Sequence, residues 1–382
     1  MKLHFDDVKG NLLDVRIDKR TEVYNWGEDN AQPSLIEVLI RSSVTAKSAV
    51  DKISKAIYGN SFGDLGSIII NKEGKTLNQM FRLSSKEYAK QNNVYLQVTY
   101  NAELKINGFK MIPTVKVRAG KDDSRGYFGK YIVYNNWDKN KTSRIESTKF
   151  SIYDVFNPNP KVIAAQIEAA KGIGNYKGQI LVIQKPTNDI YAESDLVPVM
   201  DEALLEANSQ KFRSRGAEKG FLNIKIMVVK PFTNDDDRRD FKRNLEDAQG
   251  AENAGRVLLL ESNSVTGDLK EDFTLGDLSS PYNDTLFKYS DEQAKKNIAL
   301  AFGIPRALLD LSDNTLFGDS AAMISSMKNI LWESREEDRD IFEETFNLIG
   351  KYWHDETYPK SLKITSPYIT NPNQNTTNGT NN

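Results

Sequence analysis

The 382-residue chain has no cysteine and only two histidines, and these shortages exclude several kinds of chemistry. Without cysteine there are no disulfides, zinc–thiolate sites, iron–sulfur ligands or thiol nucleophiles, a composition that fits a reducing compartment. His4 and His354 stand near opposite ends of the sequence, without the partners that a histidine metal site or a Ser-His-Asp triad needs. We expect both to be ordinary surface histidines, and we expect no metal and no cofactor.

Net charge and long apolar runs are also missing. The 51 basic and 53 acidic residues give a formal charge of −2, without the basic excess of proteins that grip DNA through its phosphates. We therefore expect any contact with nucleic acid to be local or loose. No stretch approaches the roughly 20 apolar residues of a membrane helix, and acidic residues follow the first positive charges where a signal peptide would be apolar. These features predict a protein that is synthesised and assembled in the cytoplasm, with no membrane partner.

The first half of the sequence alternates helical and strand patterns after a polar arm of about 30 residues. Helical spacing predicts two helices between Ser34 and Ile57, broken near Ser42-Ser43 and stopped by Gly59. The other elements predicted here are a strand-like stretch at Leu12–Ile17, helices at Thr76–Lys90 and Lys161–Ala170, and strands at Tyr95–Tyr100, Met111–Val117, Tyr131–Tyr134 and Ile180–Ile183.

The pattern of the second half of the sequence predicts a β-α-β insert between two helices. The first helix is expected to begin at the N-cap Ser194 and to run to about Arg215. Strand Ile224–Val229, a helix opened by Thr233-Asn-Asp-Asp236 and strand Val257–Glu261 make the insert. A helix capped by Ser290 follows and stops at Gly303-Ile-Pro305, and Asp319–Ile349 forms one very long helix or two joined by a kink. Residues 371–382 contain no apolar side chain and are expected to be disordered.

Two sequence patterns resemble nucleotide-binding or metal-binding motifs, but a purely structural role is favoured for both. Gly172-Ile-Gly174-Asn-Tyr-Lys-Gly178 follows a helix where the dinucleotide fingerprint needs a strand, so it is interpreted as a helix end and a turn. A two-metal carboxylate site is conceivable at Asp122-Asp123 or Asp235-Asp236-Asp237, because hard cations want clustered oxygen ligands. Consecutive aspartates rarely converge on one ion, and acids at a helix N-terminus are favoured by its dipole.

Two charged stretches leave alternatives open. The run Glu333–Asp340 is typical of a solvated helix face, with a subunit interface as the alternative. Lys211, Arg213 and Arg215 end the Ser194 helix, where they either complement its dipole or face a polyanion.

Three ordered segments resemble the compact class of tailed-bacteriophage portal protein. They are Trp26-Gly-Glu-Asp-Asn30 with Pro33, then Glu252-Asn-Ala-Gly-Arg256 leading to Leu258–Glu261, and then Gln293 to Leu309 with Ile298-Ala-Leu-Ala-Phe302-Gly-Ile-Pro305. The last segment is the most specific. With the elements between them, the resemblance covers about residues 22 to 350.

The resemblance implies an α+β portal fold with a wing of helices and mixed sheet, two stem helices, a β-α-β clip insert and a long kinked C-terminal helix. In this sequence, that assignment places the arm and wing at 1–193, the first stem helix at 194–220, the clip at 221–279 and the second stem helix at 280–303. The tunnel loop would fall within 304–318, the long wing helix with a reduced crown at 319–369, and the disordered tail at 370–382.

The resemblance also implies a function and its partners. The protein would form a ring, expected to be a dodecamer, at the capsid vertex of the virion, through which double-stranded DNA is packaged and ejected. It would dock the terminase large subunit and a head–tail adaptor, contact the major capsid protein, assemble in the host bacterial cytoplasm and need no catalytic residue. The implied site residues are the channel-lining loop Asp313, Asn314, Thr315, Leu316 and Phe317, the stem residues Lys211, Arg213 and Arg215, and the clip residues Asp235, Asp236, Arg238, Arg239, Asn253 and Arg256.

Two other functions are weighed against this one. Another head–tail adaptor or minor capsid-associated protein would share the assembly but not the closed ring. A carboxylate-dependent metallonuclease would use Asp122, Asp123, Asp235 or Asp236. Absence of a closed ring would favour the first alternative over a portal protein. Cleavage of DNA that depends on Mg²⁺ or Mn²⁺ would favour the second.

Overall fold

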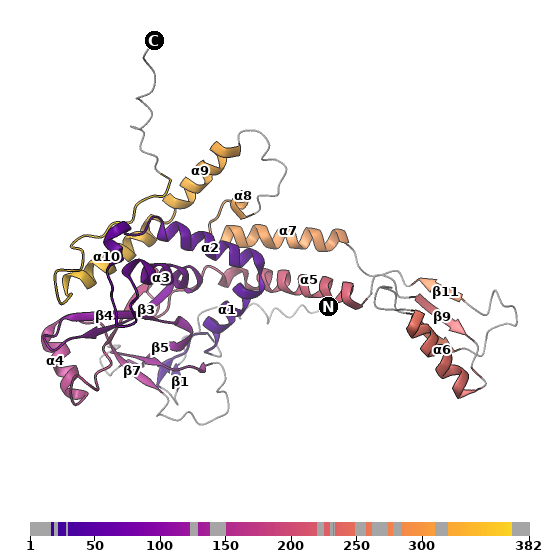
Figure 1. Cartoon of the computed structure of the whole chain (residues 1–382), viewed down its shortest axis with the longest axis horizontal. Coiled ribbons are helices and arrows are strands. Elements are labelled where there is room, and N and C mark those ends of the chain that lie inside the picture. The colour runs from indigo at the N-terminus through magenta and orange to yellow at the C-terminus, as the bar shows by residue number, and fades with distance from the viewer. Residues whose placement is uncertain are drawn as a thin grey trace, which may run out of the picture. The chain divides into compact units, whose positions relative to one another are not determined.

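The computed structural model of the chain describes residues 17–18, 22–27, 30–122, 129–137, 150–219, 225–229, 232, 234–248, 257–261, 274–277, 284–309 and 320–368. The chain divides into two compact units (Figure 1). Unit 1 comprises Met1–Ala203 and Lys296–Asn382, and unit 2 comprises Leu204–Lys295. Both units combine helices with strands, which confirms the predicted α+β class.

Unit 1 contains a mixed sheet of six strands. In chain order the strands are β3 Asn93–Tyr100, β4 Ile106–Ile112, β5 Val117–Ala119, β6 Lys130–Val133, β7 Ser151–Val155 and β8 Gln179–Gln184. Their spatial order is β4-β3-β8-β7-β6-β5, and only the β7–β8 pair among them is parallel. The predicted strand Met111–Val117 is wrong, because β4 ends at Ile112 and Pro113 leads into a 3₁₀ turn at Thr114–Lys116. A short pair, β1 Ile17–Asp18 and β2 Val23–Tyr24, precedes the sheet.

Helices cover one face of this sheet, and their ends lie where local sequence signals predict. Helix α1 spans Gln32–Ser42 and α2 spans Val44–Tyr58, with Ser43 accepting a hydrogen bond from the Ala46 amide between them. Helix α3, Leu77–Gln91, begins with a capping box formed by Thr76 and Gln79. Helix α4, Pro160–Ala169, ends in a reversal at Lys171-Gly172, as the glycine motif predicts.

Strand β3 separates two hydrophobic clusters and is therefore buried on both faces. Val94, Leu96 and Val98 belong to a large cluster that contains residues of α1, α2, α3 and α10, whereas Tyr95 belongs to a second cluster with Trp26 and other aromatic and apolar residues. Alternate residues of a strand point to opposite faces, so one strand serves both clusters. The burial of so many apolar side chains is the main stabilising contribution to unit 1.

Unit 2 contains the predicted β-α-β insert. Strand β9 Lys225–Val229 pairs in parallel with β10 Val257–Glu261, and α6 Asp235–Ala248 connects them. The N-cap of α6 is Asn234, whose side chain accepts a hydrogen bond from the Asp236 amide. A further strand, β11 Thr274–Asp277, pairs antiparallel with β9 and was not predicted.

Two predicted helix starts are wrong. Helix α5 spans Met200–Lys219 and begins after a 3₁₀ turn at Val197–Val199. The Ser194 hydroxyl accepts a hydrogen bond from the Leu196 amide over 3.3 Å and donates to the Lys90 carbonyl on α3, so it caps the turn that precedes α5 and not the first turn of α5 itself. Helix α7 spans Asp284–Ala301, so Ser290 lies within the helix. The predicted stop is confirmed, since Gly303 has a φ of +61° and the Ile304 amide bonds back to the Ala299 carbonyl.

The C-terminal segment forms two helices, α9 Ser320–Glu333 and α10 Glu336–Lys351, which are separated at Ser334-Arg335. A short helix, α8 Arg306–Leu309, follows α7. Among the described residues no helix is both long and apolar enough to span a bilayer. The predicted loop residues 313–317, the clip residues Asn253 and Arg256, His4, Asp123 and the tail at 371–382 lie outside the described residues.

Candidate functional site

The predicted stem residues lie on α5, where that helix runs beside α7. In unit 2, the Arg213 guanidinium forms an ion pair with the Asp291 carboxylate of α7. In unit 1, the Asn297 amide donates to the Glu202 carboxylate over 3.1 Å, which joins the other ends of the same two helices. Lys211 is exposed, and the side chain of Arg215 lies outside the described residues. Arg213 therefore takes part in the pairing of the two helices.

The predicted clip residues of α6 form an exposed, mixed-charge surface. Asp235, Asp236, Arg238 and Arg239 are all exposed. Arg239 donates to Asp236 over 2.7 Å, one turn along the helix, and the three consecutive aspartates lie in the first turn, where the helix dipole favours acids. The opposite side of the helix is anchored by the ring of Phe241, which lies 5.3 Å from that of Phe232. This surface can offer charges of both signs to a protein partner.

The described residues contain no group of three or more histidine, aspartate or glutamate side chains placed to hold a metal ion. Asp122 and the Asp235–Asp237 cluster belong to different compact units. His354 is not the plain surface residue that was expected. Its Nδ1 lies 3.1 Å from the Ile106 carbonyl oxygen and its ring packs 5.2 Å from that of Trp353.

The charged run Glu333–Asp340 is not simply a solvated helix face, and this prediction is corrected by the structure. Asp338 and Arg339 are buried, although they belong to a sequence that is charged almost throughout. The Arg339 guanidinium lies 3.5 Å from the centroid of the Trp332 ring and donates to the Trp332 carbonyl over 2.7 Å. Burial lowers the pKa of Arg339, against the opposing effect of the acids around it.

Around the α9–α10 junction lies a buried polar cluster that we name the elbow network, made of Tyr88, Asp195, Arg335 and Asp338. The Tyr88 hydroxyl donates to the Asp338 carboxylate over 2.8 Å. Arg335 donates to the Phe302 carbonyl at the end of α7, and its Nη1 lies 3.4 Å from Asp338 Oδ2 and 3.8 Å from Asp195 Oδ2. Burial, followed by the charge of Asp338, raises the pKa of Tyr88 well above its ordinary value, so the hydroxyl keeps its proton.

Asp195 extends this network to the segment that leads into α5. Its Oδ1 accepts hydrogen bonds from Lys185 Nζ and Asn92 Nδ2, each over 2.9 Å. One network thus joins α3, the entry to α5, the end of α7 and the start of α10 within unit 1. Sequence reasoning missed it, although the interruption of the apolar stripe at Ser334-Arg335 was a signal that this part of the helix was unusual.

The first of the portal-like segments has a structural role. Trp26 is buried and stacks on Tyr191 with ring centroids 4.1 Å apart. Asn30 is also buried, and both its side-chain and its backbone oxygen accept hydrogen bonds from the buried guanidinium of Arg118. The segment therefore fastens the chain before α1 to strand β5. In the third segment, Phe302 and Leu308 are buried in the large cluster of unit 1.

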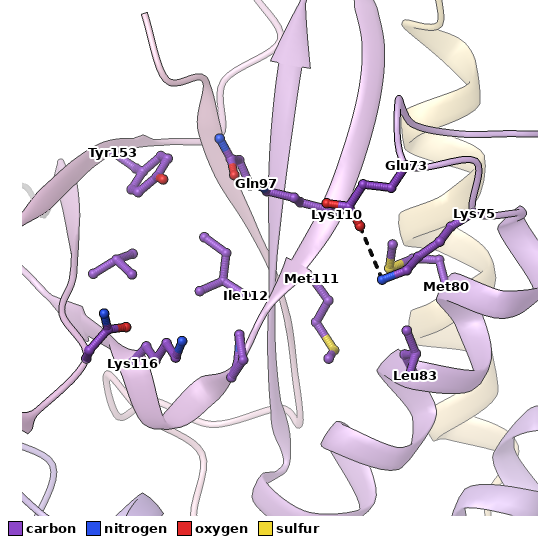
Figure 2. Close-up of a pocket in the computed structure, with 13 residues that line it drawn as sticks. Glu73, Lys75, Met80, Leu83, Gln97, Lys110, Met111, Ile112, Lys116 and Tyr153 are labelled. Carbon is purple, nitrogen blue, oxygen red and sulfur yellow. Dashed lines mark ion pairs between the residues drawn. The ribbon is translucent and has the colours of Figure 1, made fainter.

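A cavity of about 460 Å³ lies beside the sheet of unit 1, and Figure 2 draws the residues that line it. Its lining includes the apolar side chains of Met111, Ile112 and Leu83 and the cationic side chains of Lys110 and Lys116. Lys75 pairs with Glu73 over 3.3 Å, whereas within the described part of the chain no carboxylate pairs with Lys110 or Lys116. The cavity can accept an acidic or amphipathic group; its other lining residues are Met80, Gln97, Pro113, Val133, Asn135 and Tyr153.

Comparison with solved structures finds this fold in particle necks. A chain in the neck of a native gene transfer agent particle, computed with C12 symmetry, matches with a TM-score of 0.52 at 14% identity, over 84% of this chain and 81% of that chain. The chain has the fold of that neck subunit. No protein-family model and no curated protein matches the sequence.

Two further structures match with lower TM-scores. A chain from the virion of the native gene transfer agent particle gives a TM-score of 0.49 at 16% identity, over 76% of this chain and 74% of that chain. An HK97 family phage portal protein from Corynebacterium diphtheriae gives 0.38 at 11% identity, over 75% of this chain and 81% of that chain.

Proposed function

We propose that the chain is a portal protein, the subunit of a ring at the capsid vertex through which double-stranded DNA is packaged and released. The observation that carries this proposal is the fold shared with the neck subunit over 84% of this chain. That neck was computed with C12 symmetry, and we extend to this chain a closed ring of twelve copies. The protein would then be part of the virion, after assembly in the host bacterial cytoplasm.

The organisation of the chain supports this role. The β9-α6-β10 unit lies in the sequence between α5 and α7, which is the arrangement expected of a clip between two stem helices. The formal charge of −2 suits a passive conduit, because strong neutralisation of phosphates would hold DNA that has to slide. The channel loop is assigned to Asp313–Phe317, and a reconstruction that placed these residues on the outside of the ring would refute that assignment.

Partners follow from the same proposal. The exposed charges of Asp235, Asp236, Arg238 and Arg239 on α6 make this helix the proposed docking surface for the terminase large subunit and the head–tail adaptor. Unit 1 would contact the major capsid protein. Catalysis of packaging would come from a separate motor, and we propose that this chain is not an enzyme and carries no cofactor.

Electron microscopy of the purified full-length chain tests the proposal directly. We expect closed rings with an axial hole and, by native mass spectrometry, a mass near twelve copies. If the chain forms oligomers but none of them is a closed ring, the adaptor or minor capsid protein is favoured instead. Incubation of the same sample with plasmid DNA and Mg²⁺ or Mn²⁺ should leave the DNA intact, and metal-dependent cleavage would restore the nuclease hypothesis.

A further inference from the structure

Helix α9 is largely exposed. Among its 14 residues, Leu331 is the buried one of those whose side chains are described. Met323 is 51% exposed and Ile330 is 57% exposed, and together with the half-buried Met327 they follow the spacing i, i+4, i+7 along the helix. We name Met323, Met327 and Ile330 the α9 stripe. Leu331, Ile324 and Met327 pack against the large cluster of unit 1, whereas Met323 and Ile330 leave apolar surface of α9 exposed.

A second exposed apolar surface lies on a different part of unit 1. Leu35 and Val38 on α1 are 48% and 58% exposed, and Val44, the first residue of α2, is 64% exposed. Leu35 and Val38 are neighbours on the helix surface because they are three residues apart. We name these three residues the α1–α2 patch. Methionine and isoleucine side chains of the α9 stripe are well suited to pack on such a surface.

The two surfaces do not cover each other within one chain. Trp332, at the C-terminal end of α9, packs against Gly59, which follows the last residue of α2. The α1–α2 patch lies at the other end of α2, about 22 Å away for a helix of 15 residues. Figure 1 shows α9 extending away from α2, and each of the five exposed side chains remains at least 48% exposed.

The charges beside the two surfaces are complementary. Glu333, one turn after Ile330, is exposed, as are Glu336 and Glu337 at the start of α10. Arg41, one turn after Val38, has a side chain that is 81% exposed, and its nearest carboxylate is 3.6 Å away on Glu37. Lys47, one turn after Val44, is exposed and has no ion-pair partner among the described residues. An acidic end would therefore meet a basic rim if the two apolar surfaces were in contact.

We infer that the α9 stripe of one subunit packs on the α1–α2 patch of a second copy of this chain, with Glu333 facing Arg41 and Lys47. Two different surfaces of one molecule then meet, so the contact is heterologous and can repeat around a closed ring. This inference rests on the proposed ring and adds to it the residues that join neighbouring subunits. It also develops the interface alternative that the charged run at Glu333 left open.

Cross-linking tests the inference, because the chain has no cysteine of its own. Met323→Cys and Val38→Cys are made separately and together, and each preparation is treated with a short bis-maleimide. Co-expressed single variants should give linked dimers, the double variant should give a ladder of linked subunits, and each single variant alone should give neither. The matched control pairs Met323→Cys with Ile69→Cys and should cross-link at least tenfold less, because Ile69 lies outside both surfaces although it is 65% exposed against 58% for Val38.

A charge exchange gives a second readout with exposed positions that should not disturb folding. Glu333→Lys should reduce the fraction of assembled rings at low salt, and Lys47→Glu in the same chain should restore it. Dimers from either single-cysteine variant alone would indicate an isologous contact and overturn the inference. If rings form but the Met323 and Val38 positions cross-link no better than the control pair, the inferred interface is wrong and the portal proposal stands. If no rings form, the portal proposal itself is contradicted.

Discussion

The hydrogen bond between Tyr88 and Asp338 offers a quantitative test of the elbow network. Tyr88 is 1% exposed and Asp338 is 6% exposed, and the bond between them measures 2.8 Å. Tyr88→Phe removes the hydroxyl and keeps the ring. A hydrogen bond to a charged group contributes about 1.5–3 kcal/mol, and Asp338 retains Arg335 at 3.4 Å, so we expect a loss of about 2 kcal/mol.

The partner variant is expected to cost more. Asp338→Asn keeps the shape of the side chain but removes the charge that faces Arg335, whose remaining carboxylate partner, Asp195, is 3.8 Å away. Leaving a buried charge without its close partner costs about 3–5 kcal/mol, and we expect the lower end of that range because Asp195 compensates in part. The double variant should lose about 1 kcal/mol less than the sum of the two, which is the coupling free energy of the pair.

Urea unfolding followed by tryptophan fluorescence measures these losses in unit 1 alone. All four tryptophans, Trp26, Trp137, Trp332 and Trp353, lie in unit 1. With a slope of about 3 kcal/mol/M, a loss of 2 kcal/mol moves the midpoint by about 0.7 M. Protein concentration is held constant, because assembly stabilises the folded subunit by mass action.

The matched control is Tyr58→Phe. The Tyr58 hydroxyl accepts a hydrogen bond from Arg82 over 3.2 Å at an exposed site. This change should cost less than about 0.5 kcal/mol, as is usual at the surface. Equal midpoints for Tyr88→Phe and Tyr58→Phe, or a coupling free energy of zero in the double-mutant cycle, would refute the view that the elbow network stabilises unit 1.

Three further predictions follow from other parts of the structure. Gly178→Ala should destabilise unit 1 by more than about 2 kcal/mol, because Gly178 has a φ of +86° and a Cβ there would lie 2.0 Å from the Val98 carbonyl oxygen. A Cβ at Gly174 would meet nothing within 4 Å, so Gly174→Ala should be nearly neutral in the same urea assay. Equal losses of stability in the two variants would contradict this prediction. Burial raises the pKa of Tyr131 and Tyr191. Unfolded tyrosine titrates at about pH 10, so the contribution of these two tyrosines to stability is present below about pH 10 and is lost as the pH rises above it. Absorbance at 295 nm should show that part of the tyrosine ionisation occurs only when circular dichroism reports unfolding. Ionisation of all tyrosines before unfolding would contradict this prediction. Replacing Phe221–Asp277 with a Gly-Ser linker should leave the tryptophan-detected unfolding midpoint unchanged but abolish docking of terminase and adaptor in a packaging assay, and normal packaging by that variant would disprove the clip assignment.

Local signals in the sequence determined much of the secondary structure. The helical periodicity and the serines between them placed α1 and α2, the helical pattern over Thr76–Lys90 placed α3, and Gly303 ended α7, because glycine and periodicity act over a few residues. The β9-α6-β10 unit followed from the same kind of signal. Asp235, Asp236, Arg238 and Arg239 are exposed on α6, but their role as clip residues stays a prediction, and so does the channel loop, which lies outside the described residues.

Tertiary contacts decided what these local signals could not. Ser194 resembles a helix cap in sequence, and its hydroxyl does accept from the Leu196 amide, but it also donates to Lys90 on α3 and the α-helix begins only at Met200, after a 3₁₀ turn. Asp338 and Arg335 look like members of a solvated charged run, yet the partner that buries Asp338 is Tyr88, 250 residues away in the chain. The free energy of a charged side chain depends on the groups that surround it in space, and these come from segments that no local pattern connects. The sequence by itself therefore determined where most helices and strands form, and the tertiary structure decided which charges are buried at the elbow and which apolar residues of α1, α2 and α9 remain exposed.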